Sequence, residues 1–166
     1  MKRQGAPSLI RPLLLKVDLQ VATQGQRLPA PKELNTWVRA VLVERRQAAE
    51  VTIRIVGKVE SAALNQRYRG RRGPTNVLAF PFDSPVRLTV PLLGDIVICA
   101  PIVRREAEEQ GKEAQAHWAH LVVHGTLHLL GYDHQTPLQA HHMESLEQTV
   151  LAALGFPNPY VEASSS

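Results

Sequence analysis

Three histidines in the second half of the chain have the residue type and spacing of a metal site. His124 and His128 are four residues apart in a segment with a helical pattern, and His134 follows after a short turn sequence. Side chains four apart on a helix lie about 5–6 Å from each other, so two imidazoles can bind one ion at about 2.0–2.1 Å. Gly131 can adopt a positive φ and end the helix, which lets His134 become a third ligand. Three protein ligands and an open position are typical of a catalytic zinc.

The same spacing occurs in the long zinc-protease motif, where a glutamate after the first histidine acts as the base. Gly125 occupies that position here. Zinc lowers the pKa of a bound water to about 7, so hydroxide is available at the metal without a separate base. This is one way for the site to work without a glutamate at position 125. The spacing therefore predicts a catalytic metal site, and a zinc-dependent hydrolase of a peptide or another small polar substrate is an alternative that Gly125 disfavours. Imidazole also suits nickel and other borderline metals.

A second chemical feature is a basic cluster of four arginines beside Tyr68 and two glycines. Its members are Arg67, Arg69, Arg71 and Arg72. Clustered arginines next to an aromatic side chain are typical of a phosphate-binding surface. The alternative is a solvated helix end and loop, and the charge pattern alone does not separate the two.

Residues around the histidine motif have roles that the spacing leaves open. Asp133 precedes His134, so its carboxylate can orient this ligand or act as a base, or it can cap the turn after Gly131. His120 lies one helical turn before His124 and is interpreted as a supporting or core residue, and His117 as structural. His141 and His142 are expected on the surface of the last helix.

Hydrophobic periodicity predicts an α+β fold with four strands in one mixed sheet and about five helices. The expected strands cover residues 13–21, 51–56, 75–80 and 94–99. Helices are expected from Pro31, from Val59, after Pro101, over residues 113–130 and from Pro137. The 113–130 helix is apolar on most sides, which predicts that it runs through the core. For the last helix, the predicted packed face consists of Leu138, Leu146, Val150, Ala153 and Leu154.

Bulk properties are those of one globular domain. The chain has 166 residues, 44% hydrophobic content and a formal net charge of +4. We expect a flexible extension over residues 1–10, one domain over 11–160 and a disordered tail over 161–166. The single cysteine, Cys99, excludes an internal disulfide and is expected to be a buried hydrophobe. No apolar run approaches the ~20 residues of a membrane span, and we expect a cytoplasmic protein without membrane contact.

Four sequence blocks together resemble the YbeY family of rRNA-maturation endoribonucleases. They are residues 64–69 (LNQRYR), 74–82 (PTNVLAFPF), 93–98 (LGDIVI) and the histidine run 124–134 (HGTLHLLGYDH), in the family's order. The resemblance extends from about the first strand to Tyr160. After His134 the family often has acidic residues, whereas residues 135–138 are neutral here.

The resemblance implies a single-strand-specific endoribonuclease that acts in 16S rRNA 3′-end maturation and ribosome quality control. It implies one zinc bound by His124, His128 and His134, and Arg69 as the functional arginine. The implied partners are single-stranded RNA, 16S rRNA and the small ribosomal subunit. A third reading is a non-catalytic ribosome-binding factor with a structural zinc, although structural sites normally have four ligands.

Overall fold

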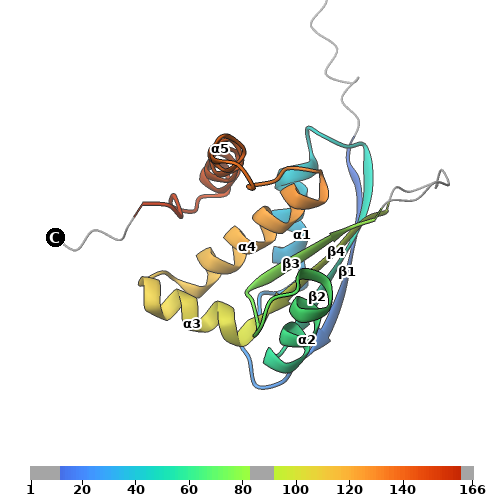
Figure 1. The fold of residues 1–166 in the computed structure, drawn as a ribbon. Helices are drawn as coiled ribbons and strands as arrows, with labels where there is room; N and C mark the ends of the chain where they lie inside the picture. Colours follow the sequence, from blue (N-terminus) through green and yellow to red (C-terminus); the bar gives the residue numbers. More distant parts are fainter. Residues whose placement is uncertain (1–11, 83–91, 162–166) are drawn as a thin grey trace, which may run out of the picture.

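Four strands form one mixed sheet in the order β1-β2-β4-β3 (Figure 1). The computed structural model describes residues 12–82 and 92–161. The strands are β1 (Leu14–Ala22), β2 (Ala48–Val56), β3 (Val77–Pro81) and β4 (Leu92–Cys99). The helices are α1 (Pro31–Leu42), α2 (Lys58–Arg69), α3 (Ala100–Gln110), α4 (Ala114–Leu129) and α5 (Pro137–Ala153).

The short strand β3 forms one edge of the sheet. β1, β2 and β4 run parallel, whereas β3 pairs antiparallel with β4. Gly94 in β4 permits a close approach between these two strands, because a Cβ there would lie 2.2 Å from the carbonyl oxygen of Phe80. Its φ of +143° is also one that L side chains rarely adopt. The edge strand is thus held against β4 by a position that only glycine fits.

Helices cover both faces of the sheet (Figure 1), with α1 and α4 on one face and α2 on the other. Alternate residues of β4 follow this division, as the strand period of two requires. Ile96 and Ile98 belong to the core under α4, and Val97 and Cys99 to the smaller core under α2. α5 packs on α4 at its side away from the sheet (Figure 1). α4 therefore lies between the sheet and other helices, which confirms its predicted place in the core.

The predicted α+β fold, four strands and five helices are confirmed, with element ends displaced by a few residues. The predicted packed face of α5 is wrong at two positions. Leu138 is 79% exposed and Ala153 is also exposed, whereas Met143, Glu147 and Leu151 are buried. The reason is that the buried stripe of α5, formed by Met143, Glu147, Val150 and Leu151, begins more than one turn after Leu138 and does not include Ala153.

The predictions for residues 1–10 and for most of the tail concern residues outside the described ranges. Within residues 12–82 and 92–161, no helix combines the length and apolar character that a membrane crossing requires. Cys99 is 1% exposed, as expected for a small buried hydrophobe.

Candidate metal centre

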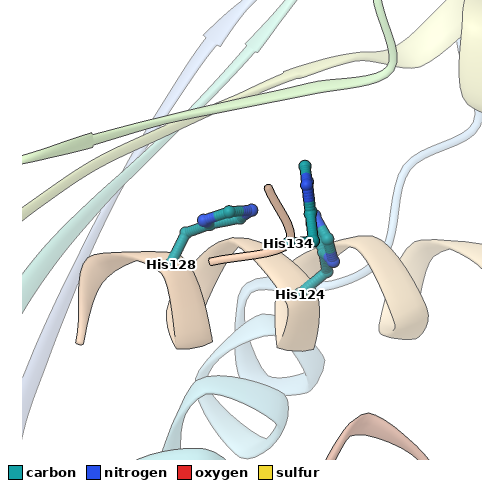
Figure 2. Close-up of side chains that lie close together, drawn as sticks. All are labelled: His124, His128 and His134. Atoms are coloured by element: carbon teal, nitrogen blue, oxygen red, sulfur yellow. The ribbon is translucent and has the colours of Figure 1, made fainter. Parts of the chain in front are cut away.

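The end of α4 brings the three predicted ligands together. His124 and His128 lie on one side of α4, and His134 enters from the turn that follows (Figure 2). One candidate ligand atom from each ring lies within 4.8 Å of the other two. The ring centroids are 4.7 Å apart for His124 and His128, and 4.8 Å apart for His128 and His134. The three side chains can therefore hold one metal ion.

The turn that returns His134 to this point is built by Gly131. Its φ is +102°, and its N–H donates to the carbonyl of His128 at 2.9 Å. The N–H of Tyr132 then donates to the carbonyl of Leu127 at 3.2 Å. This bond pair is the Schellman motif that ends many helices at a glycine. The predicted helix end and its mechanism are confirmed.

Asp133 contributes to this turn through its side chain. Its Oδ1 accepts a hydrogen bond from the backbone N–H of His134 at 2.7 Å. The contact fixes the backbone of the third histidine and agrees with the turn-capping interpretation. Asp133 also lines the cavity into which the three histidines open, so a supporting role at the site stays a prediction.

A buried carboxylate that the sequence analysis missed lies behind His124. Glu147 of α5 has no exposed area, and its Oε2 lies 2.6 Å from Nδ1 of His124. Its Oε1 lies 2.8 Å from Nε2 of His120 and also accepts from the hydroxyl of Tyr160. Metal-binding histidines commonly donate their second ring N–H to a carboxylate. The sequence does contain a signal, because Glu147 shares the buried stripe of α5 with Met143 and Val150.

Two shifted pKa values follow from these surroundings. Burial opposes the ionisation of Glu147, but hydrogen bonds from His120, His124 and Tyr160 outweigh the effect of burial. They lower the pKa of Glu147 to about 2. Burial and the neighbouring His124 and His134 lower the pKa of His128 to about 4. At neutral pH His128 is therefore uncharged and has a lone pair available for a metal.

His117 belongs to a separate buried network, as its predicted structural role implies. Its Nε2 lies 2.8 Å from Oε1 of Glu106, and Nδ2 of Asn76 donates to the same oxygen at 2.9 Å. Oδ1 of Asn76 accepts from the N–H of Val77 at 2.6 Å. Hydrogen bonds from His117 and Asn76 hold the pKa of Glu106 below its ordinary value despite burial. Because Asn76 lines the cleft at the histidines, this network positions one of its walls.

The histidines open into a cleft of about 790 Å³. One wall is formed by α4 and its following turn, and the other by β3 and the segment between α2 and β3. Among the described residues, the lining includes Arg69 and Arg71 but not Arg67 or Arg72. The predicted basic cluster is thus divided, and two of its arginines share a cleft with the metal ligands.

Arg69 is held against the edge of the sheet rather than extended into solvent. Its Nη2 donates to the carbonyl of Ala79 at 3.0 Å, and its guanidinium lies 5.9 Å from the ring centroid of Phe80. Arg69 can make these contacts because α2 ends beside β3, where Gly70 turns the chain with a φ of +66°.

Three histidines that can bind a metal, next to an arginine-lined cleft on an α+β scaffold, define a candidate metal-dependent hydrolase for an anionic substrate. The family model described as Endoribonuclease YbeY matches residues 20–155. Endoribonuclease YbeY of Nitrosococcus oceani is 55% identical over 148 residues, which cover 88% of this chain and 97% of that protein. The chain belongs to the YbeY family of endoribonucleases.

A solved structure supports the fold. The solution structure of a Thermotoga maritima protein has a TM-score of 0.53 to this chain at 24% sequence identity. The match covers 82% of this chain and 91% of that one. At this identity the similarity concerns the fold alone, and it agrees with the α+β architecture described above.

Proposed function

We propose that this protein is a metal-dependent endoribonuclease that cleaves single-stranded RNA at the centre formed by His124, His128 and His134. The observation that carries the proposal is the shared cleft: the three histidines and Arg69 line one cavity of about 790 Å³. A metal site next to arginines suits a phosphodiester, which combines a cleavable bond with negative charge. Family membership supports the same activity.

The donor set fits a borderline divalent metal. Three imidazoles are ligands that zinc, nickel and similar ions accept, and the Nδ1 contact of His124 with Glu147 leaves its Nε2 as the ligand atom. When bound, zinc at these histidines would supply Lewis-acid polarisation of the phosphate and activation of an oxygen nucleophile. We propose zinc as the native ion, one per chain.

Arg69 is proposed to hold the scissile phosphate. A guanidinium has five N–H donors in a planar fork that matches phosphate oxygens, and Arg69 uses one of them on Ala79. That bond restrains the side chain at the cleft, so less conformational entropy is lost when a phosphate binds. Asp133 is proposed to act by fixing the backbone of His134, through the 2.7 Å hydrogen bond.

The biological role is proposed from the family resemblance. It comprises 16S rRNA 3′-end maturation and ribosome quality control in the cytoplasm, with the small ribosomal subunit as partner. The arginines of the cleft support an RNA partner because phosphate contacts supply most of the sequence-independent affinity for nucleic acids.

Peptide hydrolysis is the alternative that the histidine spacing raised, and packing at Gly125 opposes it. A Cβ at Gly125 would lie 2.9 Å from Cγ2 of the fully buried Ile96. A side chain at the position that carries the general base in zinc proteases would therefore displace the buried Ile96 side chain.

The edge of β3 also offers little to an extended peptide. The backbones of Asn76 and Phe82 form hydrogen bonds with β4. Because residues of an antiparallel strand alternate between bonding to the partner strand and facing away from it, the backbone groups of Val77, Ala79 and Pro81 face outward from the sheet edge. Of these, the N–H of Val77 bonds to Asn76, the carbonyl of Ala79 accepts from Arg69, and Pro81 has no N–H. An edge occupied in this way is a poor template for strand addition.

A non-catalytic binding factor with a structural zinc is the remaining alternative. Among the residues that the structure describes, the group that can hold a metal has three histidines, whereas structural zinc normally has four protein ligands. The geometry thus favours a centre with a position open to the cleft.

The proposal is tested with an end-labelled RNA that contains the 3′ region of 16S rRNA. We expect the zinc-loaded protein to cut the single strand, the chelated protein to be inactive, and added zinc to restore cleavage. The same RNA in a duplex and a DNA of the same sequence serve as controls for strand and sugar specificity. Cleavage that is unchanged after complete metal removal, or digestion of casein that a chelator abolishes, would contradict the proposal.

A further inference from the structure

The segment after α5, residues 155–161, packs back onto α1, the loop between α3 and α4, and the helices α4 and α5. Phe156 contacts Trp37 of α1 edge to face, with ring centroids 6.0 Å apart. Nζ of Lys112 donates to the carbonyl of Pro159 at 2.7 Å. Tyr160 then places its ring against His120, at a centroid distance of 5.3 Å, and its hydroxyl on Glu147. This C-terminal segment is therefore fixed at three points, the last of which is next to the metal site.

Glu147 connects that segment to a predicted metal ligand. Its two oxygens divide their partners, with Oε1 on His120 and Tyr160, and Oε2 on Nδ1 of His124. An ionised carboxylate only accepts hydrogen bonds, so the hydroxyl of Tyr160 and the two ring nitrogens are the donors. A donor at Nδ1 means that neutral His124 carries its proton there and presents the lone pair of Nε2.

The carboxylate of Glu147 also fixes the orientation of the His124 ring. Burial of Glu147 is complete, and a buried carboxylate needs each of its hydrogen bonds. The hydroxyl of Tyr160 and the ring of His120 hold one oxygen, which leaves the other in a fixed place. The plane of the His124 ring is then set by a hydrogen bond whose acceptor cannot move freely.

We propose that Glu147 is a positioning residue that selects the tautomer and ring orientation of His124, and that Tyr160 fixes Glu147 for this purpose. The C-terminal segment thus belongs functionally to the metal centre, although none of its residues lines the cleft. This role rests on the proposed function only through the metal centre, and it concerns metal affinity rather than RNA cleavage. Removal of such a carboxylate partner typically weakens metal binding by about 10–100-fold.

The test measures zinc affinity by competition with a chromogenic chelator for four single variants of the full chain. We expect Glu147→Gln to weaken zinc binding by about 10–100-fold and Tyr160→Phe by a smaller factor of about tenfold or less. Glu144→Gln on the same helix and Tyr68→Phe on α2 are the matched controls and should bind zinc like the wild type. If Glu147→Gln does not fold, Tyr160→Phe decides, because it removes one oxygen atom from a side chain that is 41% exposed.

A spectroscopic signature separates positioning from general stability. Long-range ¹H–¹⁵N NMR of the wild type should show neutral His124 protonated at Nδ1, with the resonance of Nε2 shifting when zinc is added. Its assignment follows from the loss of these signals in His124→Ala. Wild-type zinc affinity in both test variants, or zinc on Nδ1 of His124, would overturn this role alone. A wild-type protein that binds no zinc would overturn the proposed metal centre and this role with it.

Discussion

Nη2 of Arg69 donates a 3.0 Å hydrogen bond to the carbonyl of Ala79, which joins the end of α2 to the edge of β3. The bond has two consequences. It occupies an outward-facing backbone acceptor next to the metal centre, and it holds a cation in the cleft that the three histidines share. Arg69 therefore contributes to the fold and lines the cleft, and we expect its substitution to affect both stability and RNA cleavage.

We predict that Arg69→Glu reduces RNA cleavage by more than one to two decades, because one charge-assisted phosphate contact contributes about 1.5–3 kcal/mol and reversal adds repulsion. The free energy of unfolding should fall by about 0.5–1.5 kcal/mol, since the bond to Ala79 is also lost. Single-turnover cleavage and urea unfolding measure the two effects. Metal content should stay at the wild-type level.

Arg72→Glu is the matched control, since it makes the same charge change outside the cleft lining. It should change cleavage only slightly. Arg71→Glu should have an intermediate and salt-dependent effect, because Arg71 lines the cleft and phosphate contacts weaken with salt. Small and equal losses for Arg69 and Arg72 variants would remove Arg69 from the site.

We predict that His124→Ala and His128→Ala lose the metal, while His141→Ala retains it. The first two histidines belong to the group that can hold an ion, whereas His141 is exposed on α5. Chelation should lower the melting temperature of the wild type, because an ion at 100 times its Kd stabilises the folded state by about 2.7 kcal/mol. Elemental analysis and calorimetry give the readouts. Full metal content in both α4 variants would refute the ligand assignment.

The sequence was sufficient for features that depend on neighbours along the chain. The histidine cluster follows from an i, i+4 pair, a glycine with positive φ and one further histidine, all within eleven residues. Strand and helix assignments followed from hydrophobic periodicity, which is also a pattern among residues that are close in the sequence. These signals do not require knowledge of how distant elements pack.

Contacts between distant elements could not be read in this way. Glu147 reaches His124 because α5 packs on α4, and Tyr160 reaches Glu147 because the segment after α5 folds back. Likewise, no local pattern indicates that Arg69 bonds to Ala79. The exposed Leu138 shows the converse error, since an apolar residue at helical spacing was assigned to a face that α4 does not reach.

The Glu106 network predicts a pH dependence of stability. The pKa of the Glu106 carboxyl is lower in the folded protein than the ordinary value of 4.5, because the hydrogen bond from His117 outweighs the effect of burial. A depressed carboxyl pKa adds stability above the unfolded-state pKa, and this contribution is lost as the pH falls through the folded-state value. Glu106→Gln should therefore be less stable than the wild type at pH 7, with a difference that shrinks below about pH 4.5.

Urea unfolding from pH 7 to pH 3 measures this difference. Glu108→Gln is the control, because its side chain is 71% exposed and pairs with Arg104 on the same helix at 3.4 Å. It should show a small difference that varies little with pH. A Glu106→Gln deficit that persists unchanged at pH 3 would contradict the assigned role of its charge.

Gly125 gives the last prediction, which concerns why the protease glutamate is absent. Alanine normally stabilises a helix interior by about 1 kcal/mol relative to glycine, but a Cβ here would lie 2.9 Å from Cγ2 of Ile96. Overpacking a core costs typically 1–3 kcal/mol, so Gly125→Ala should leave stability unchanged or lower it by up to about 2 kcal/mol. In the background of Ile96→Ala, which removes Cγ2, the same substitution should instead stabilise the protein by about 1 kcal/mol. Urea unfolding of the four proteins in this cycle measures the coupling, and equal effects of Gly125→Ala in both backgrounds would show that contact with Ile96 does not exclude a side chain at this position.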